Sequence, residues 1–101
     1  MIEAAEAAMR FAEGRDRSAL DSDEMLRFAI VRAIEVIGEA ASRISQISQD
    51  AAPAIPWREV VAMRNRLVHA YYDINRDILW RTVHEEIPGI LPVLRAELDR
   101  E

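Results

Sequence analysis

Residues 21–48 read DSDEMLRFAIVRAIEVIGEAASRISQIS, the longest regular pattern in the chain. At about 100° per residue its apolar side chains gather on one side, which predicts a helix from the candidate N-caps Asp21 and Ser22 to about Ser48. The apolar arc is wider than one neighbouring helix covers, so we expect two or more packing partners, with a second chain as a candidate for one of them. Gly38 stands at the margin of the arc, where a missing side chain lets another backbone approach closely. The arc consists of Leu26, Ile30, Ala33, Ile34, Ile37, Ala41 and Ile44, broadened by Ala29, Val36, Ala40 and Ile47.

Before and after this stretch, the sequence predicts one further helix and two connections. An Ala-rich helix covers residues 2–13 and ends at Gly14. Residues 15–20 form a polar linker. Pro53 and Pro56 place a loop at residues 49–56.

The second half of the chain predicts further helices and no strand. One runs from Trp57 to about Tyr71, and another follows a cap at Asp73 or Asn75. Pro88 and Gly89 interrupt that helix, and a last segment covers residues 87–99. Short loops between such helices favour an all-α fold, an antiparallel up-and-down bundle of four to five helices in a single domain over residues 1–101.

Composition bounds the class of protein. The chain has 101 residues, of which 50% are hydrophobic and 31% charged, and it contains no cysteine. This length fits one domain, and the absence of cysteine removes disulfide frameworks, zinc knuckles and thiol nucleophiles. Because the sequence shows neither a signal-peptide pattern nor an uncharged run long enough to span a membrane, we expect a cytoplasmic protein without a membrane partner.

The charge is acidic overall but uneven. A net charge of −5 argues against a general nucleic-acid coat. Residues 57–81 nevertheless carry five arginines against three acids, a local charge of +2 that leaves −7 on the rest of the chain. Arg58, Arg66 and Arg81 in this segment are candidate RNA-binding residues, with ordinary surface ion pairs as the alternative.

The groups that could do chemistry gather in residues 63–72, MRNRLVHAYY. Arg64 falls inside the apolar stripe of the predicted helix, where a guanidinium is costly without a partner or a water-lined cleft. Asn65 and His69 stand four residues apart and share one flank. Arg64 and His69 are about 140° apart on an ideal helix. They converge on one site only through the long reach of arginine, a helix end or a symmetry-related copy. Tyr71 comes near only if the helix frays there.

These groups suit the cleavage of RNA by its own 2′-hydroxyl, because the substrate supplies the nucleophile. An imidazole can move the protons, and an arginine fork can stabilise the phosphorane. One such histidine per chain is short of a separate base and acid, which two chains meeting at this face would supply. The alternative is that Arg64 is a structural hydrogen-bonding hub and that His69 is an unremarkable helical residue.

Other features receive plainer interpretations. There is no Gly-rich phosphate loop and no HExxH motif, and the carboxylates are spaced to pair with arginines on solvent-facing helix sides. A metal site is therefore not expected, and no cofactor is predicted. His84 is interpreted as a surface histidine. Trp57 and Trp80 are interpreted as core or interface anchors rather than base-stacking platforms.

The sequence resembles the HepT-like branch of the HEPN superfamily, small all-helical proteins with an Arg-x4-6-His signature. Residues 64–71, RNRLVHAY, match its Arg-x-x-x-x-His-x-Tyr form, including the polar residue after the arginine. The similarity continues at residues 55–59 (IPWRE), 36–41 (VIGEAA), 78–80 (ILW) and 86–88 (EIP). It covers almost the whole chain, although the chain begins a little later than relatives that carry a charged stretch before the first helix.

The resemblance implies a homodimeric bundle whose two signature segments meet in a basic cleft. It implies a metal-independent endoribonuclease, the toxin of a type VII-like toxin–antitoxin system, that leaves a cyclic phosphate and a free 5′-hydroxyl. By this likeness Arg64 and His69 are catalytic and Asn65 supports them. The implied antitoxin is a nucleotidyltransferase that uses ATP to add AMP to Tyr71, which would place bulk and negative charge where an RNA phosphate binds.

Two rival hypotheses keep the helical fold. One is a non-catalytic partner that binds or presents nucleotides to the same nucleotidyltransferase. The other is a plain dimerisation module in which Arg64 and His69 are structural. The complete set of Arg64, Asn65, His69 and Tyr71 favours the ribonuclease over the dimerisation module, but a nucleotide-binding cleft would use the same groups.

Overall fold

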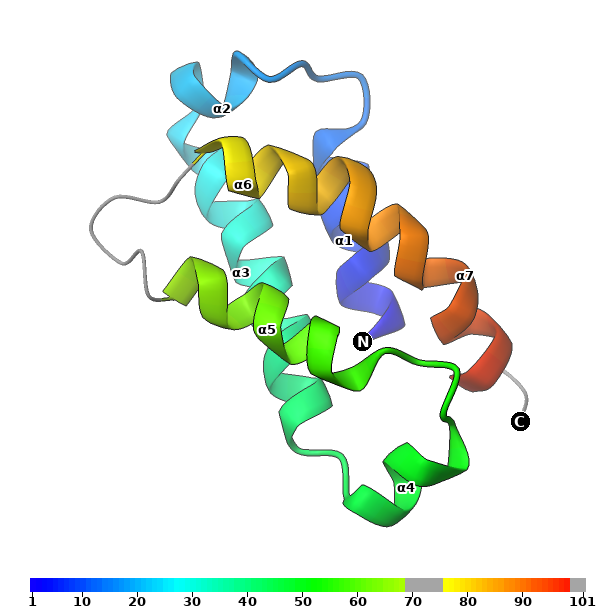
Figure 1. The fold of residues 1–101 in the computed structure, drawn as a ribbon. Helices are drawn as coiled ribbons and strands as arrows, with labels where there is room; N and C mark the ends of the chain where they lie inside the picture. The colour runs from blue at the N-terminus through cyan, green and yellow to red at the C-terminus, as the bar shows by residue number, and fades with distance from the viewer. Residues whose placement is uncertain (69–75, 99–101) are drawn as a thin grey trace.

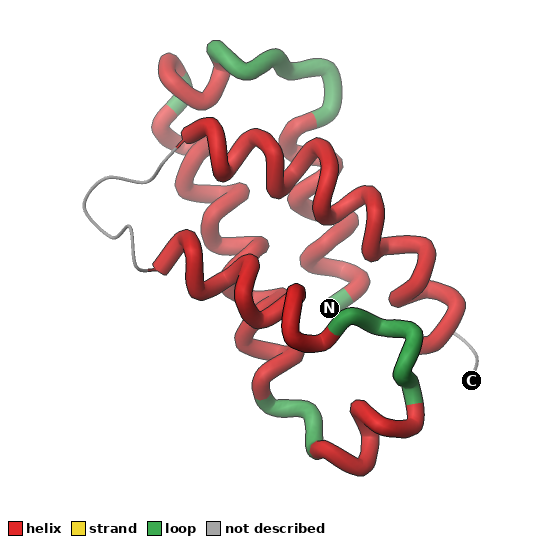
Figure 2. Tube along the Cα trace, in the orientation of Figure 1, coloured by secondary structure: helices red, strands yellow, loops and turns green. Residues whose placement is uncertain are grey.

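The computed structural model describes residues 1–68 and 76–98, and in these ranges every regular element is helical (Figures 1 and 2). The predicted all-α class is confirmed for this part of the chain. The elements are α1 (Ile2–Ala12), α2 (Ala19–Ser22), α3 (Glu24–Ser42), α4 (Gln46–Ala51), α5 (Trp57–Val68), α6 (Arg76–Arg81), the π-helical turn η1 (Thr82–Glu86) and α7 (Ile87–Leu98).

The packing centres on α3, which lies against both α1 and α5. Figure 1 shows α1 and α3 running in opposite directions, with α5 and the α6–α7 stretch across them. Ile30, Ile34 and Ile37 of α3 are completely buried. They meet small alanines of α1 and larger side chains of α5, among them Met63. The expectation that the wide arc of this helix needs two partners is confirmed, and both lie in the same chain.

The long second helix is shorter at both ends than predicted. Asp23, not Asp21 or Ser22, is the N-cap of α3, and its carboxylate accepts a hydrogen bond from the Leu26 amide at 3.0 Å. The short helix α2 takes up the end of the predicted linker. At the C-terminal end, a second N-cap limits the helix. Ser45 Oγ accepts a hydrogen bond from the Ser48 amide at 3.2 Å, so α4 starts there as a separate helix. The prediction of one helix to Ser48 is wrong.

The predicted last segment from residue 87 is confirmed, since α7 begins at Ile87 and has Pro88 in its first turn. The chain does not leave helical geometry at Pro88 and Gly89, however, so the predicted interruption is a change of helix type and not a break. The residues before them form the π-helical turn η1, where the amide of Ile87 donates to the carbonyl of Thr82. Proline normally clashes with the carbonyl four residues earlier, that of His84 here. The wider turn relieves that clash, so α6, η1 and α7 form one bent helical stretch.

The first helix ends close to the predicted residue, and the loop before Trp57 begins later than predicted. The first helix ends at Ala12, and Gly14 adopts a left-handed φ of +72°, as predicted for a glycine stop. The loop predicted at residues 49–56 begins later, because α4 reaches Ala51. The predicted caps at Asp73 and Asn75 lie outside the described residues. None of the described helices is both long and apolar enough to cross a lipid bilayer.

Candidate functional site

Arg64 projects from α5 at the place where this helix crosses α3. Its neighbours Val60 and Met63 are buried in the core, whereas Arg64 itself is half-buried. The prediction that this guanidinium emerges from an apolar stripe is therefore confirmed. The stem of Arg64 lies directly on the backbone of Gly38 in α3, as expected for a glycine that admits a close neighbour.

Two nitrogens of the Arg64 guanidinium differ in their surroundings among the described residues. Its Nη1 donates to Oδ1 of Asn65 at 3.2 Å. Its Nε is buried and has no hydrogen-bond acceptor in the described part of the chain. A buried donor without a partner costs about 1–3 kcal/mol, so folding stability alone does not explain this placement of Arg64. Phosphate oxygens bind arginine in a forked geometry, which makes the half-buried guanidinium a candidate phosphate ligand.

Arg66 points to a different neighbour. Its Nη2 donates to both carboxylate oxygens of Glu86, at 2.8 and 2.9 Å, which ties α5 to η1. A hollow of about 270 Å³ lies beside this ion pair, between α5 and α7. A surface ion pair is the alternative that the sequence left open for Arg66, and the structure shows one, although no sequence pattern identifies Glu86 as its partner twenty positions away. An arginine held in this way would have to leave Glu86 before it could bind RNA.

The remaining candidate residues fall into two groups. Arg58 and Arg81 are exposed on α5 and α6, where solvent-borne phosphates can reach them. His69 and Tyr71 lie outside the described residues. The convergence of Arg64 with His69, and the approach of Tyr71, therefore remain predictions.

The tryptophans and the second histidine occupy the places that the sequence indicates. Trp57 is half-buried and its Nε1 donates to the carbonyl oxygens of Gln49 and Ala52, so it anchors α4 to the start of α5. Trp80 is half-buried and packs edge-on against the ring of His84, with ring centroids 3.6 Å apart. His84 itself is exposed, which confirms the interpretation as a surface histidine.

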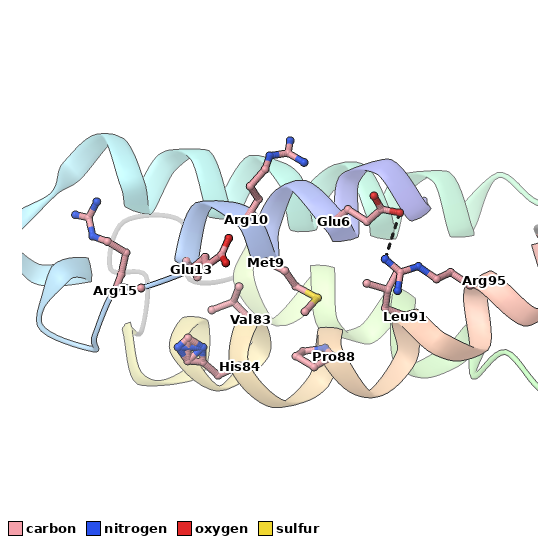
Figure 3. A pocket seen from close by; sticks show the side chains of 12 residues that line it. Glu6, Met9, Arg10, Glu13, Arg15, Val83, His84, Pro88, Leu91 and Arg95 are labelled. Carbon is pink, nitrogen blue, oxygen red and sulfur yellow. Dashed lines mark ion pairs between the residues drawn. The ribbon is translucent and has the colours of Figure 1, made fainter.

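A larger hollow of about 610 Å³ lies between α1 and the η1–α7 stretch (Figure 3). Met9, Val83 and Leu91 give it an apolar lining, and charged side chains of both signs surround them. One pair of these charges, Glu6 and Arg95, is 3.5 Å apart. No residue of α5 lines this hollow, so it is separate from the Arg64 site. No sequence pattern predicts this hollow, because its walls come from opposite ends of the chain.

No three His, Cys, Asp or Glu residues are grouped closely enough to hold a metal ion in residues 1–68 and 76–98. At the Arg64 site, the described residues bring together a guanidinium and the amide of Asn65.

Comparison with known proteins places this arrangement in a family. A sequence profile described as "Ribonuclease HepT-like" matches residues 1–97. The "Putative RNase MJ1380" of Methanocaldococcus jannaschii is 36% identical over 90 residues, which cover 89% of this chain and 83% of that protein. The "Probable ribonuclease HepT" of Thermococcus cleftensis is 44% identical over 68 residues, 67% of this chain and 62% of that protein. No solved structure is significantly similar to the chain. With a family profile that spans nearly all of its residues, the chain belongs to the HepT-like ribonuclease family.

Proposed function

We propose that this chain is an endoribonuclease that cuts RNA without a metal ion and acts as the toxin of a toxin–antitoxin pair. The observation that carries the proposal is Arg64, a half-buried guanidinium whose Nε lacks an acceptor in the described residues, within the signature of a family of ribonucleases. The relatives named as RNases support the same activity class.

The reaction is a transesterification within the RNA strand. The 2′-oxygen attacks the adjacent phosphorus while a base takes its proton. The bond from phosphorus to the 5′-oxygen breaks as an acid protonates that oxygen. The products are a 2′,3′-cyclic phosphate and a 5′-hydroxyl, and no water or cofactor is consumed. Arg64 stabilises the charge that builds on the phosphorane, and Asn65 holds the guanidinium through the Nη1 contact.

Base and acid are the His69 side chains of two chains that meet as a homodimer. Two chains thus provide the separate base and acid that one signature histidine per protomer cannot provide alone. Arg58, Arg66 and Arg81 add positive charge for the RNA strand, with Arg66 released from Glu86 when RNA binds.

Control of the toxin falls to a nucleotidyltransferase antitoxin that transfers AMP from ATP to Tyr71. The phosphodiester adds negative charge beside the site and repels the RNA backbone. Mass spectrometry after incubation with the antitoxin and ATP would show one AMP per chain on the wild type and none on Tyr71→Phe. An unmodified wild-type chain would contradict this form of control.

The test of the ribonuclease is incubation of the purified protein with total RNA in EDTA. We expect wild-type protein to cut, and His69→Ala and Arg64→Ala to lose about 100-fold or more of the rate, because each removes a group needed in the transition state. His84→Ala is the matched control, since this exposed histidine lines the hollow between α1 and α7, to which no residue of α5 contributes, and it should cut normally. Intact RNA with wild-type protein would reject the ribonuclease and leave the nucleotide-binding partner as the better hypothesis.

A further inference from the structure

Gly38 lowers the stability of the helix in which it lies, so its presence needs a reason other than helix formation. It lies inside α3, four residues before the last residue of this helix, Ser42, and is buried. Glycine in a helix interior is less favourable than alanine, because it loses more backbone freedom on folding. The flanking positions use good helix formers or core residues, Ile37 and Glu39. The chain therefore gives up helix stability at this one point.

The contact with Arg64 accounts for the glycine. A Cβ placed on Gly38 would overlap Cβ of Arg64 and would lie 2.7 Å from its Cγ and 3.2 Å from its Cδ. These atoms form the root of the arginine side chain, which cannot swing away as its tip can. A side chain at residue 38 would therefore force the α5 backbone or the first torsion of Arg64 to shift.

The other two glycines do not have this property. A Cβ on Gly14 or on Gly89 would meet nothing within 4 Å. Gly14 owes its identity to its positive φ, and Gly89 is exposed in α7. Only at Gly38 does the missing side chain make room for a residue of the signature.

We propose that Gly38 is the positioning residue for Arg64. With the stem pressed on the α3 backbone, the Nε is buried and Nη1 reaches Asn65. A shift at the root of the side chain is carried to its tip, so the direction of the guanidinium depends on the absence of a Cβ at residue 38. This inference rests on the proposed function for its catalytic consequence, but its structural part can be tested without RNA.

The experiment compares Gly38→Ala with Gly89→Ala, the same exchange in a helix with free space. We expect Gly89→Ala to melt at or above the wild-type temperature and Gly38→Ala to melt below it, although both gain helix propensity. In ¹⁵N NMR the Arg64 Nε–H signal, assigned with Arg64→Lys, should exchange slowly with solvent in wild type and Gly89→Ala. In Gly38→Ala it should shift and exchange faster. If RNA is cut, kcat should fall about 100-fold in Gly38→Ala, with KM within about threefold of wild type.

A double variant covers the case in which Gly38→Ala does not fold. Arg64→Gly removes all three atoms that a Cβ at residue 38 would meet, so Gly38→Ala should cost no stability in that background. An equal loss of stability with and without the Arg64 side chain would overturn the proposal. So would a Gly38→Ala protein with the wild-type Nε–H signal. If wild-type protein cuts no RNA, the ribonuclease proposal fails, whereas the melting and NMR comparisons still decide the Gly38–Arg64 contact.

Discussion

At the scale of single residues, Trp57 joins two helices through one N–H group. Its Nε1 lies 3.2 Å from the Gln49 carbonyl oxygen and 3.1 Å from that of Ala52, at the end of α4. Because α4 buries none of its own residues, this bond is a main tie between it and the rest of the fold. The sequence indicated an anchor at Trp57 but not which helix it holds.

We predict that Trp57→Phe lowers the free energy of unfolding by about 1–2 kcal/mol, since it leaves two carbonyls without their donor and removes part of a packed ring. Urea denaturation followed by circular dichroism measures the change. Trp80→Phe is the control, because phenylalanine can keep the ring contact with His84. Equal losses in the two variants would show that ring volume, not the indole N–H, stabilises this corner.

The contact between Gly38 and Arg64 could be predicted only in part from the sequence. Gly38 could be recognised as a place for close approach, and Arg64 as a guanidinium inside an apolar stripe. That the two meet depends on how α3 and α5 are rotated about their own axes. Neither helical pattern contains this rotation, because each describes one helix alone.

At the scale of elements, a set of ion pairs fastens α2 to the start of α6. Arg17 bridges Asp21 and Asp77, at 3.0 and 2.8 Å, and Arg76 contacts Asp21 at 3.0 Å. The hydrogen bond from Arg17, followed by that from Arg76, lowers the pKa of Asp21. In Asp23 the Leu26 amide lowers the pKa most, followed by the Arg15 guanidinium.

These shifts predict a loss of stability in acid. A carboxyl whose pKa is lower in the folded state contributes stability above its unfolded pKa of about 4, and this is lost as the pH falls through the lowered folded value. We expect the melting temperature to drop between about pH 5 and pH 2, and Asp21→Asn to drop less because one of the shifted groups is gone. Asp50→Asn, which replaces a carboxylate bonded to the neutral Gln46 amide, should follow the wild-type curve. An Asp21→Asn curve parallel to wild type would contradict this assignment.

The residues at which the helices begin and end could not be predicted from the local sequence pattern alone. Three consecutive residues, Asp21, Ser22 and Asp23, are each able to cap a helix, and the choice of Asp23 leaves room for α2. Ser45 ends a pattern whose apolar period continues unbroken to Ile47. The joint at Pro88 depends on a π-helical turn, which has no periodic signature. The long helices were predictable from periodicity, whereas competition among caps and backbone adjustments decided their ends.

At the scale of the whole molecule, α3 exposes several apolar side chains on a side that also carries the ion pairs of Arg32 with Glu35 and of Arg43 with Glu39. Met25 is 82% exposed and Phe28 56% exposed, and Val36 follows on the same side. Exposed apolar side chains that share a face are typical of surfaces that associate. Association through some face is part of the proposed function, which needs two histidines.

We therefore predict a dimer. Sedimentation equilibrium at micromolar concentration should give about twice the 11.5 kDa chain mass. The His69→Ala variant should give the same mass, because the imidazole is proposed to act on RNA and not to hold the chains together. A wild-type monomer under these conditions would contradict a site built from two chains.

RNA is proposed to supply its own nucleophile at the Arg64 site, and one substitution in the substrate removes that nucleophile. A short RNA with a mapped cut is compared, in EDTA, with the same RNA that lacks only the 2′-hydroxyl at the cut. We predict that the unmodified RNA is cut to a 2′,3′-cyclic phosphate and a 5′-hydroxyl, and that the RNA without the 2′-hydroxyl stays intact at this position. Cleavage of both at equal rates would contradict it.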